Sequence, residues 1–105
     1  MQLLIEFDVF ADLIDVPDFV IEQKDTLRNS FLNWMYNPKV KHKYWVTCKD
    51  KDGVKYRTLR YRSDAFIEWL NKKVLKGNLQ RAVLIEENVT NWPSEQFSSI
   101  PSIFF

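Results

Sequence analysis

Several residue types are scarce in this chain of 105 residues, and each scarcity excludes a class of site. Only two glycines are present, where average usage of about 7% would give roughly seven, so glycine-rich phosphate-binding loops are excluded. One cysteine cannot form an internal disulfide, and a single histidine leaves no zinc-ligand spacing. No apolar run approaches the roughly 20 residues of a membrane span.

The N-terminal segment MQLLIEFDVF carries acids where a secretory signal peptide carries basic residues. We therefore expect a cytoplasmic protein with no membrane contact. The length predicts one domain, which we place over residues 1–87, followed by an aromatic tail over residues 88–105. A monomer and a homodimer are both compatible with these data.

The sequence offers no set of residues suited to catalysis. His42 and Cys48 lie six residues apart, roughly 20 Å along a strand, so they cannot act as base and nucleophile or share a metal. The N-terminal acids supply the oxygens that magnesium prefers, but helix starts and loops also collect acids. These acids are Asp8, Asp12, Asp15 and Asp18. We expect no catalytic residue, no metal and no cofactor, and hence no enzyme.

Charge divides sharply along the chain. Residues 1–25 hold seven acids against one lysine, a net charge of −6, whereas residues 26–76 hold thirteen basic residues against four acids, a net charge of +9. The remaining segment has a net charge of −2, and the chain as a whole is at +1. Such asymmetry indicates either an acidic partner for the basic part or neutralisation by the acidic N-terminal segment within the fold.

The apolar pattern predicts strands over 2–9 and 80–87, a helix between Asp18 and Tyr36, and a second helix over 64–76. Residues 10–18 are expected to form an irregular connection. With a hairpin between the helices, the order is β-α-β-β-α-β, typical of the split βαβ or ferredoxin-like sandwich: α+β, an antiparallel sheet with two helices on one face. The first residues also fit helical spacing, which would give a three-stranded sheet with an additional N-terminal helix.

Asp52-Gly53 between two alternating runs predicts a β-hairpin over residues 40–62. A two-residue loop pairs Val46 with Leu59, and a four-residue loop shifts the register by two and keeps the same faces. The predicted core face holds Val40, His42, Tyr44, Val46, Cys48, Leu59 and Tyr61, with Arg57 as a misfit. The predicted outer face holds Lys41, Lys43, Trp45, Thr47, Lys49, Tyr56, Thr58, Arg60 and Arg62, and no acid.

A basic and aromatic face of this kind predicts a small, non-enzymatic protein that binds nucleic acid. Lysine and arginine neutralise phosphates, a two-stranded ribbon fits the major groove of DNA, and aromatic rings stack on unpaired bases. The residues expected to contact the partner are Lys41, Lys43, Trp45, Lys49, Tyr56, Arg60 and Arg62. An equally weighted alternative is a solvated, lysine-rich face without a partner.

The tail, NVTNWPSEQFSSIPSIFF, is rich in large apolar residues and has no basic residue. Left in water it would expose an apolar patch of a size that monomers usually avoid, so we expect it to pack on its own core. The alternative function is a protein-interaction module, an inhibitor or regulatory accessory protein, acting through this tail or through exposed aromatic residues such as Trp34 and Trp69.

The segment from Lys43 to Lys73 combines a strand, an Asp-Gly turn, a second strand and a helix that begins Ser-Asp-Ala-Phe-Ile-Glu-Trp. In this outline it resembles the arm-type DNA-binding domains of phage integrases. Those domains place three consecutive strands before their helix, whereas here a helix-forming stretch and Pro38 occupy the place of the first strand. No functional residue is carried over from that family. The small size and the lysine and asparagine usage would suit an accessory protein of a phage or mobile element.

Overall fold

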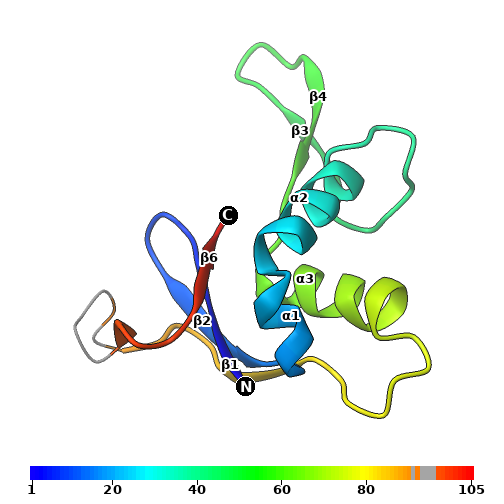
Figure 1. Cartoon of the computed structure of the whole chain (residues 1–105). Coiled ribbons are helices and arrows are strands. Elements are labelled where there is room, and N and C mark those ends of the chain that lie inside the picture. Colours follow the sequence, from blue (N-terminus) through cyan, green and yellow to red (C-terminus); the bar gives the residue numbers. More distant parts are fainter. Residues whose placement is uncertain (91, 93–96) are drawn as a thin grey trace.

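A computed structural model describes residues 1–90, 92 and 97–105 of the chain. The described part has the predicted α+β composition. It contains a four-stranded sheet, three α-helices packed beside that sheet, and a two-stranded hairpin that projects away from both (Figure 1). None of the described helices is long and apolar enough to span a membrane.

The four-stranded sheet joins the two ends of the chain. Its strands are β1 (Gln2–Glu6), β2 (Ala11–Asp15), β5 (Val83–Glu86) and β6 (Ser102–Phe104), arranged in the order β5-β2-β1-β6. The β1–β2 and β2–β5 pairs are antiparallel, while β6 runs parallel to β1 and pairs Ile103 with Ile5. The sheet is therefore mixed rather than antiparallel.

The helices cover one face of this sheet. They are α1 (Asp18–Glu22), α2 (Lys24–Met35) and α3 (Ser63–Trp69), and α3 continues directly into the π-helical segment η1 (Leu70–Val74). α2 ends at Met35, next to the predicted limit at Tyr36, because the residue before Pro38 is pushed out of helical space. The second helix also ends before Gly77, whose φ of +79° suits glycine.

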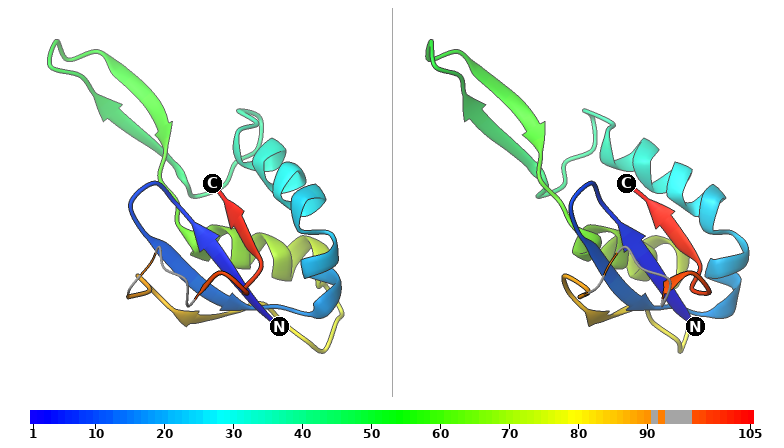
Figure 2. Two further views of the ribbon diagram at one scale, coloured as in Figure 1. Left: turned by 60° about the vertical axis from the view of Figure 1, so that its left-hand side comes forward. Right: turned by 90° about the vertical axis from the view of Figure 1, so that its left-hand side faces the viewer.

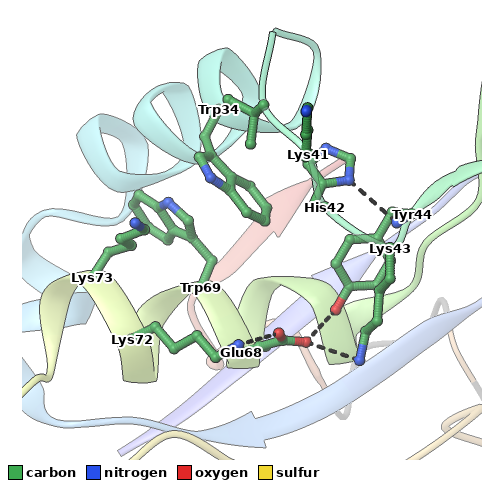
Figure 3. A pocket seen from close by; sticks show the side chains of 10 residues that line it. Trp34, Lys41, His42, Lys43, Tyr44, Glu68, Trp69, Lys72 and Lys73 are labelled. Atoms are coloured by element: carbon green, nitrogen blue, oxygen red, sulfur yellow. Dashed lines mark hydrogen bonds and ion pairs between the residues drawn. The ribbon is translucent and has the colours of Figure 1, made fainter. Parts of the chain in front are cut away.

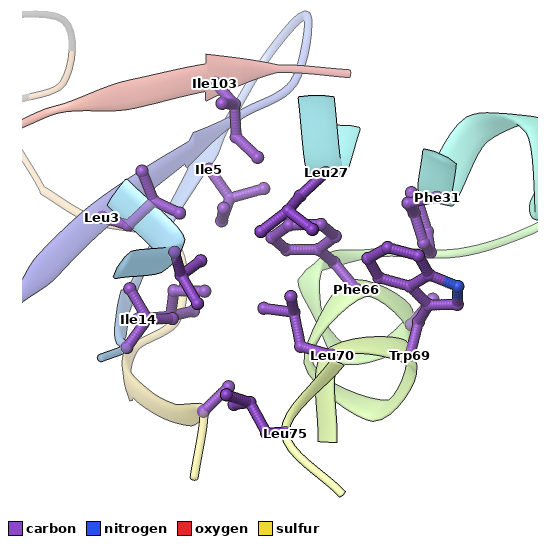
Figure 4. Packing of buried hydrophobic residues seen from close by; sticks show 14 of the residues in the cluster. Leu3, Ile5, Ile14, Leu27, Phe31, Phe66, Trp69, Leu70, Leu75 and Ile103 are labelled. Atoms are coloured by element: carbon purple, nitrogen blue, oxygen red, sulfur yellow. The ribbon is translucent and has the colours of Figure 1, made fainter. Parts of the chain in front are cut away.

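The main core lies between the sheet and the helices (Figure 4). Leu3 and Ile5 of β1 belong to this core together with Phe31 of α2 and Phe66 of α3, and all four are fully buried. The rings of Phe31 and Phe66 pack edge to face with their centroids 5.3 Å apart. Phe105 adds a further ring, 5.3 Å from each of them, so the last residue of the chain packs against this core.

The opposite face of the sheet is covered by the tail. Side chains alternate along a strand, so Leu4 and Leu13 point away from the helices, and they form a second buried cluster with Val89. Trp92, Phe97 and Ile100 pack partly buried against this cluster. Apolar cover on both faces gives β1 three consecutive buried residues, Leu3 to Ile5. Residues 91 and 93–96 of the predicted tail lie outside the described residues.

The split βαβ order is not confirmed. A strand forms within the predicted range 2–9 but covers only residues 2–6, and residues 11–15 form a second strand, β2, where we expected an irregular connection. The prediction missed β2 because Asp12, its second residue, looks like a surface residue, whereas it is fully buried. The hairpin does not join the main sheet, and β6 lies in the segment that we assigned to the tail.

The hairpin is formed by β3 (Trp45–Lys49) and β4 (Lys55–Leu59) and extends outward from the body in each view (Figure 2). Only its base is anchored: Tyr44 is buried in the main core, and Leu59 and Tyr61 pack against that core partly buried. We refer to residues 45–59 as the hairpin arm.

Candidate functional site

The turn of the hairpin arm contains three residues, not two or four. Asp50 pairs with Val54 through the Val54 carbonyl, and the amide of Gly53 donates to the Asp50 carbonyl over 3.0 Å. The Asp50 side chain accepts hydrogen bonds from the amides of Asp52 and Val54, both at 2.9 Å. Gly53 has a φ of +80°, as the left-handed position of a three-residue hairpin loop requires.

This odd loop length makes the predicted faces wrong. Trp45 pairs with Leu59 and Lys49 with Lys55, so the register differs by one residue from both loops that we considered. A one-residue shift moves every side chain of one strand to the other face. One face of the arm therefore holds Trp45, Thr47, Lys49, Lys55, Arg57 and Leu59, and the other holds Val46, Cys48, Tyr56 and Thr58.

The predicted partner-binding residues consequently separate into four places. Trp45 and Lys49 lie on one face of the arm, and Tyr56 lies on the opposite face. Arg60 lies just beyond β4, where its amide donates to the Tyr44 carbonyl. The other three residues lie at the base of the hairpin: Lys41 and Lys43 border a pocket, and Arg62 turns toward β2.

Arg62 is held by the body of the protein. Its Nη2 donates to the buried carboxylate of Asp12 over 3.2 Å and to the side chain of Asn88 over 2.9 Å. Its guanidinium also lies 3.9 Å above the ring of Phe10. Asp12 accepts two further hydrogen bonds, from the Ser63 hydroxyl at 2.6 Å and from the Asn88 amide at 2.9 Å. Arg62 therefore fixes the hairpin base to β2.

The hairpin region from residue 41 to residue 62 keeps most of its positive charge free of ion pairs. Eight basic residues lie between residues 41 and 62, against Asp50 and Asp52. Among the described residues, only Lys43 and Arg62 of these eight form an ion pair. In the part of the chain that the structure describes, the acidic N-terminal segment forms one ion pair with the hairpin, that of Asp12 with Arg62.

Two lysines face each other directly across the arm. Lys49 and Lys55 are cross-strand partners, and both are exposed. Like charges at directly opposite positions destabilise a sheet, by roughly 0.2 to 1 kcal/mol. The arm therefore gives up stability at this position, and a bound anion would offset that loss.

Trp45 is enclosed rather than open to solvent. The guanidinium of Arg57 lies 4.6 Å from its ring centroid, and the His42 ring stacks on it at 5.8 Å with an interplanar angle of 2°. Its Nε1 is buried and finds no acceptor among the described residues. Tyr56, by contrast, is about half exposed, at 49%.

A pocket of about 390 Å³ opens at the base of the hairpin, between α2 and α3 (Figure 3). We call it the basal pocket. Trp34 of α2 and Trp69 of α3 project into it from its two sides, and His42 and Tyr44 complete its aromatic lining. Four lysines and one acid also line it: Lys41, Lys43, Lys72, Lys73 and Glu68.

The carboxylate of Glu68 is already bound by neighbouring side chains. It accepts hydrogen bonds from Lys72 Nζ at 2.7 Å and from the Tyr44 hydroxyl at 2.6 Å, and Lys43 Nζ lies 3.1 Å away. These contacts, that of Lys72 first, lower the pKa of Glu68 from 4.5 to about 2. Burial, followed by the hydrogen bond to Glu68, raises the pKa of Tyr44 well above its ordinary value. The pocket keeps a formal net charge of +3 with His42 neutral.

His42 has a structural role in the pocket wall. Its Nε2 lies 2.9 Å from the Met35 carbonyl and donates to it, while its Nδ1 accepts from the Tyr44 amide at 3.2 Å. The His42 ring also lies 4.7 Å from that of Trp34. These contacts tie the hairpin base to the end of α2.

Sequence reasoning did not assemble the basal pocket. The sequence indicated Trp34 and Trp69 only as candidate contacts with a protein partner, and it assigned no binding role to Lys72 and Lys73. The spacing of Trp69, Lys72 and Lys73 does place them on one face of a helix, and this pattern could have indicated one wall of the pocket. The sequence did not indicate that segment 40–44 would lie against this face.

Within the described ranges, no three or more histidine, cysteine, aspartate or glutamate side chains gather closely enough to hold a metal ion. Cys48 is a free thiol, half-buried on the arm. No protein-family model matches the chain, and neither the curated proteins nor the solved structures compared with it contain a match.

Proposed function

We propose that this protein binds nucleic acid through the hairpin arm and the adjoining basal pocket. The observation that carries the proposal is the direct apposition of Lys49 and Lys55 on an arm that projects from the body. Self-repulsion of this kind is relieved when phosphates lie between the two ammonium groups and release their counterions. Lys51 and Arg57, both exposed, extend the same positive field.

The other groups of the site support the same proposal. Lys41 and Lys43 continue the positive charge from the arm into the basal pocket, and Glu68 there is already paired. Arg62 has a different role, because it is committed to Asp12. We therefore assign the phosphate contacts to the lysines of the arm and the pocket and to Arg60, and the anchoring of the arm to Arg62.

One substitution separates binding from stability. Lys55→Glu places a carboxylate opposite Lys49, so the arm should become more stable, by roughly 0.2 to 1 kcal/mol, while phosphate binding weakens. Fluorescence anisotropy with labelled oligonucleotides at about 50 and about 200 mM salt measures the binding. The wild-type protein should bind with a strong salt dependence, and Lys55→Glu should bind more weakly with a smaller salt slope.

The matched control is Lys76→Glu, an exposed lysine outside both the arm and the basal pocket. It makes the same change in net charge and should lower the affinity much less. Equal losses for the two variants would mean that binding follows net charge alone. No salt-dependent binding by the wild-type protein at micromolar concentration would refute the proposed function.

A protein partner is the second candidate, and the strand β5 favours it. Val83, Leu84 and Ile85 are each nearly half exposed at the edge of the sheet. An edge strand with exposed apolar side chains can pair with the same strand of a second copy about a two-fold axis. Light scattering over a range of concentrations tests for this dimer, and Leu84→Lys should abolish it. The tail offers less to a partner, because Ile103 is buried.

A further inference from the structure

We infer that the basal pocket holds one unstacked base, so that the ligand of this protein is single-stranded nucleic acid. This inference rests on the proposed function and specifies its substrate class. It draws on the position of the pocket, its aromatic lining and the distribution of charge around it.

The position of the basal pocket excludes a paired base. It lies between α2 and α3, with the hairpin base as its third wall (Figure 3). Bases of a duplex are stacked and paired, and they reach a pocket within a protein body only after they leave the stack. A base in a single strand needs no such extrusion. The volume of about 390 Å³ falls within the range of roughly 300 to 1,000 Å³ found for small-molecule sites.

The aromatic lining suits a planar, uncharged ring. Trp34 is partly exposed at the pocket, and His42, 4.7 Å from it, supports its orientation. Trp69 is buried and forms the wall from α3, where Phe31 holds its ring at 5.7 Å. Stacking on a tryptophan accepts any base, because every base presents a π-face. Trp34 is therefore the residue on which the base stacks.

The charge around the pocket suits the phosphates on either side of that base. Lys41 and Lys73 are exposed at the pocket and have no ion pair among the described residues. Lys43 and Lys72 hold Glu68, so this carboxylate does not repel an incoming phosphate at full strength. A single nucleic-acid strand that leaves the pocket past Lys41 would continue along the arm, because residues 41–44 lead directly into β3.

Three ligands of equal length test the inference on the unmodified protein: a single strand, the same strand without bases, and the duplex. The duplex carries the highest charge density, so electrostatics alone would make it the tightest ligand. We expect the single strand to bind about tenfold or more tightly than the abasic strand, and more tightly than the duplex. Equal affinity for the single and abasic strands, or tightest binding of the duplex, would overturn the inference. A protein that binds none of the three would refute the proposed function itself.

Two aromatic variants locate the base. Trp34→Leu keeps an apolar side chain against Phe31 and should lower the affinity for the single strand to that of the abasic strand. Tyr56→Leu, on the exposed arm, should leave the ratio of the two affinities unchanged. A cooperative thermal unfolding transition would verify that each variant is folded. A ratio that collapses in Tyr56→Leu and not in Trp34→Leu would place the base on the arm and contradict the assignment to the pocket.

Discussion

Arg62 and Asp12 join the end of the hairpin to the second strand of the sheet, with Arg62 Nη2 3.2 Å from a carboxylate oxygen that is shielded from water. The hydroxyl of Ser63 and the amide of Asn88 donate to the same carboxylate. One acid thus holds three segments that are far apart in the sequence. It also links the arm to the core, so the orientation of the arm depends on a residue outside it.

We predict that Asp12→Ala destabilises the protein by about 3 kcal/mol or more. Removing the buried carboxylate leaves the Ser63 hydroxyl and the Asn88 backbone amide without this acceptor. Arg62 loses its ion pair with Asp12 and keeps its other acceptors. Denaturant unfolding measures the change. Asp8→Ala removes an exposed acid from the same N-terminal segment and should change the stability by less than about 0.5 kcal/mol. Similar effects of the two substitutions would contradict the anchoring role.

The carboxylate of Glu68 predicts a pH dependence of stability. Its pKa in the folded protein, about 2, lies below its ordinary value of 4.5, so the folded state binds a proton less readily than the unfolded state. The contribution of Glu68 is therefore complete above about pH 5.5 and is lost as the pH falls from about 4.5 toward 2. Unfolding midpoints of the wild-type protein and of Glu68→Gln should differ at neutral pH and converge in acid.

Glu22→Gln is the control for this titration, because Glu22 is exposed on α1 and has no ion pair within the described part of the chain. Its midpoints should follow those of the wild-type protein at every pH. A constant difference between the wild-type protein and Glu68→Gln from neutral pH to about pH 2 would show that the lysines do not act through the charge of Glu68.

The strand β6 permits a comparison between adjacent residues. Ile103 points into the main core and is 3% exposed, whereas Phe104 points outward. Ile103→Ala should cost about 2 to 5 kcal/mol, and Phe104→Ala less than about 1 kcal/mol, although phenylalanine is the larger side chain. Denaturant unfolding of both variants measures this. The reverse order would mean that β6 does not occupy its place beside β1.

The turn of the arm should respond locally to substitution. Gly53→Ala forces a β-carbon into a conformation with φ of +80°, which costs roughly 1 to 2 kcal/mol even though no neighbouring atom lies in its way. Because the arm projects from the body, we expect faster amide exchange at Cys48 and Tyr56, a hydrogen-bonded pair of the arm, without an equal fall in the stability of the core. Asp50→Ala, which removes the acceptor for two turn amides, should act in the same way. A uniform loss of protection throughout the main sheet would show that the arm and the core unfold together.

Local signals in the sequence predicted several elements correctly, but they missed the hairpin register, which depends on a single side chain. Asn37-Pro38 and Gly77 marked the helix ends, and Asp52-Gly53 marked the hairpin. The register depended on Asp50, whose carboxylate accepts two amides and thereby selects a loop of three residues. The alternation of apolar residues does not show whether the hairpin loop has an odd or an even number of residues.

The remaining errors concern contacts between distant segments. The strand β2 was missed because the buried acid Asp12 finds its hydrogen-bond donors in distant segments, among them Arg62, fifty positions away. The basal pocket was missed because Trp34 and Trp69 come together only when α2 and α3 pack beside each other. Patterns within a segment predict secondary structure, but they do not specify which polar groups will meet across the fold.

The π-helical segment η1 has a consequence for the length of the chain. Leu70 and Leu75 are both fully buried, and the Leu75 amide donates to the Leu70 carbonyl over 2.7 Å across five positions. A π-turn corresponds to an α-helical turn with one residue inserted. Deleting one residue between these leucines would give the four-residue spacing at which a regular α-helix keeps both on one face. The segment that carries Lys72 and Lys73 is thus one residue longer than the burial of the two leucines requires.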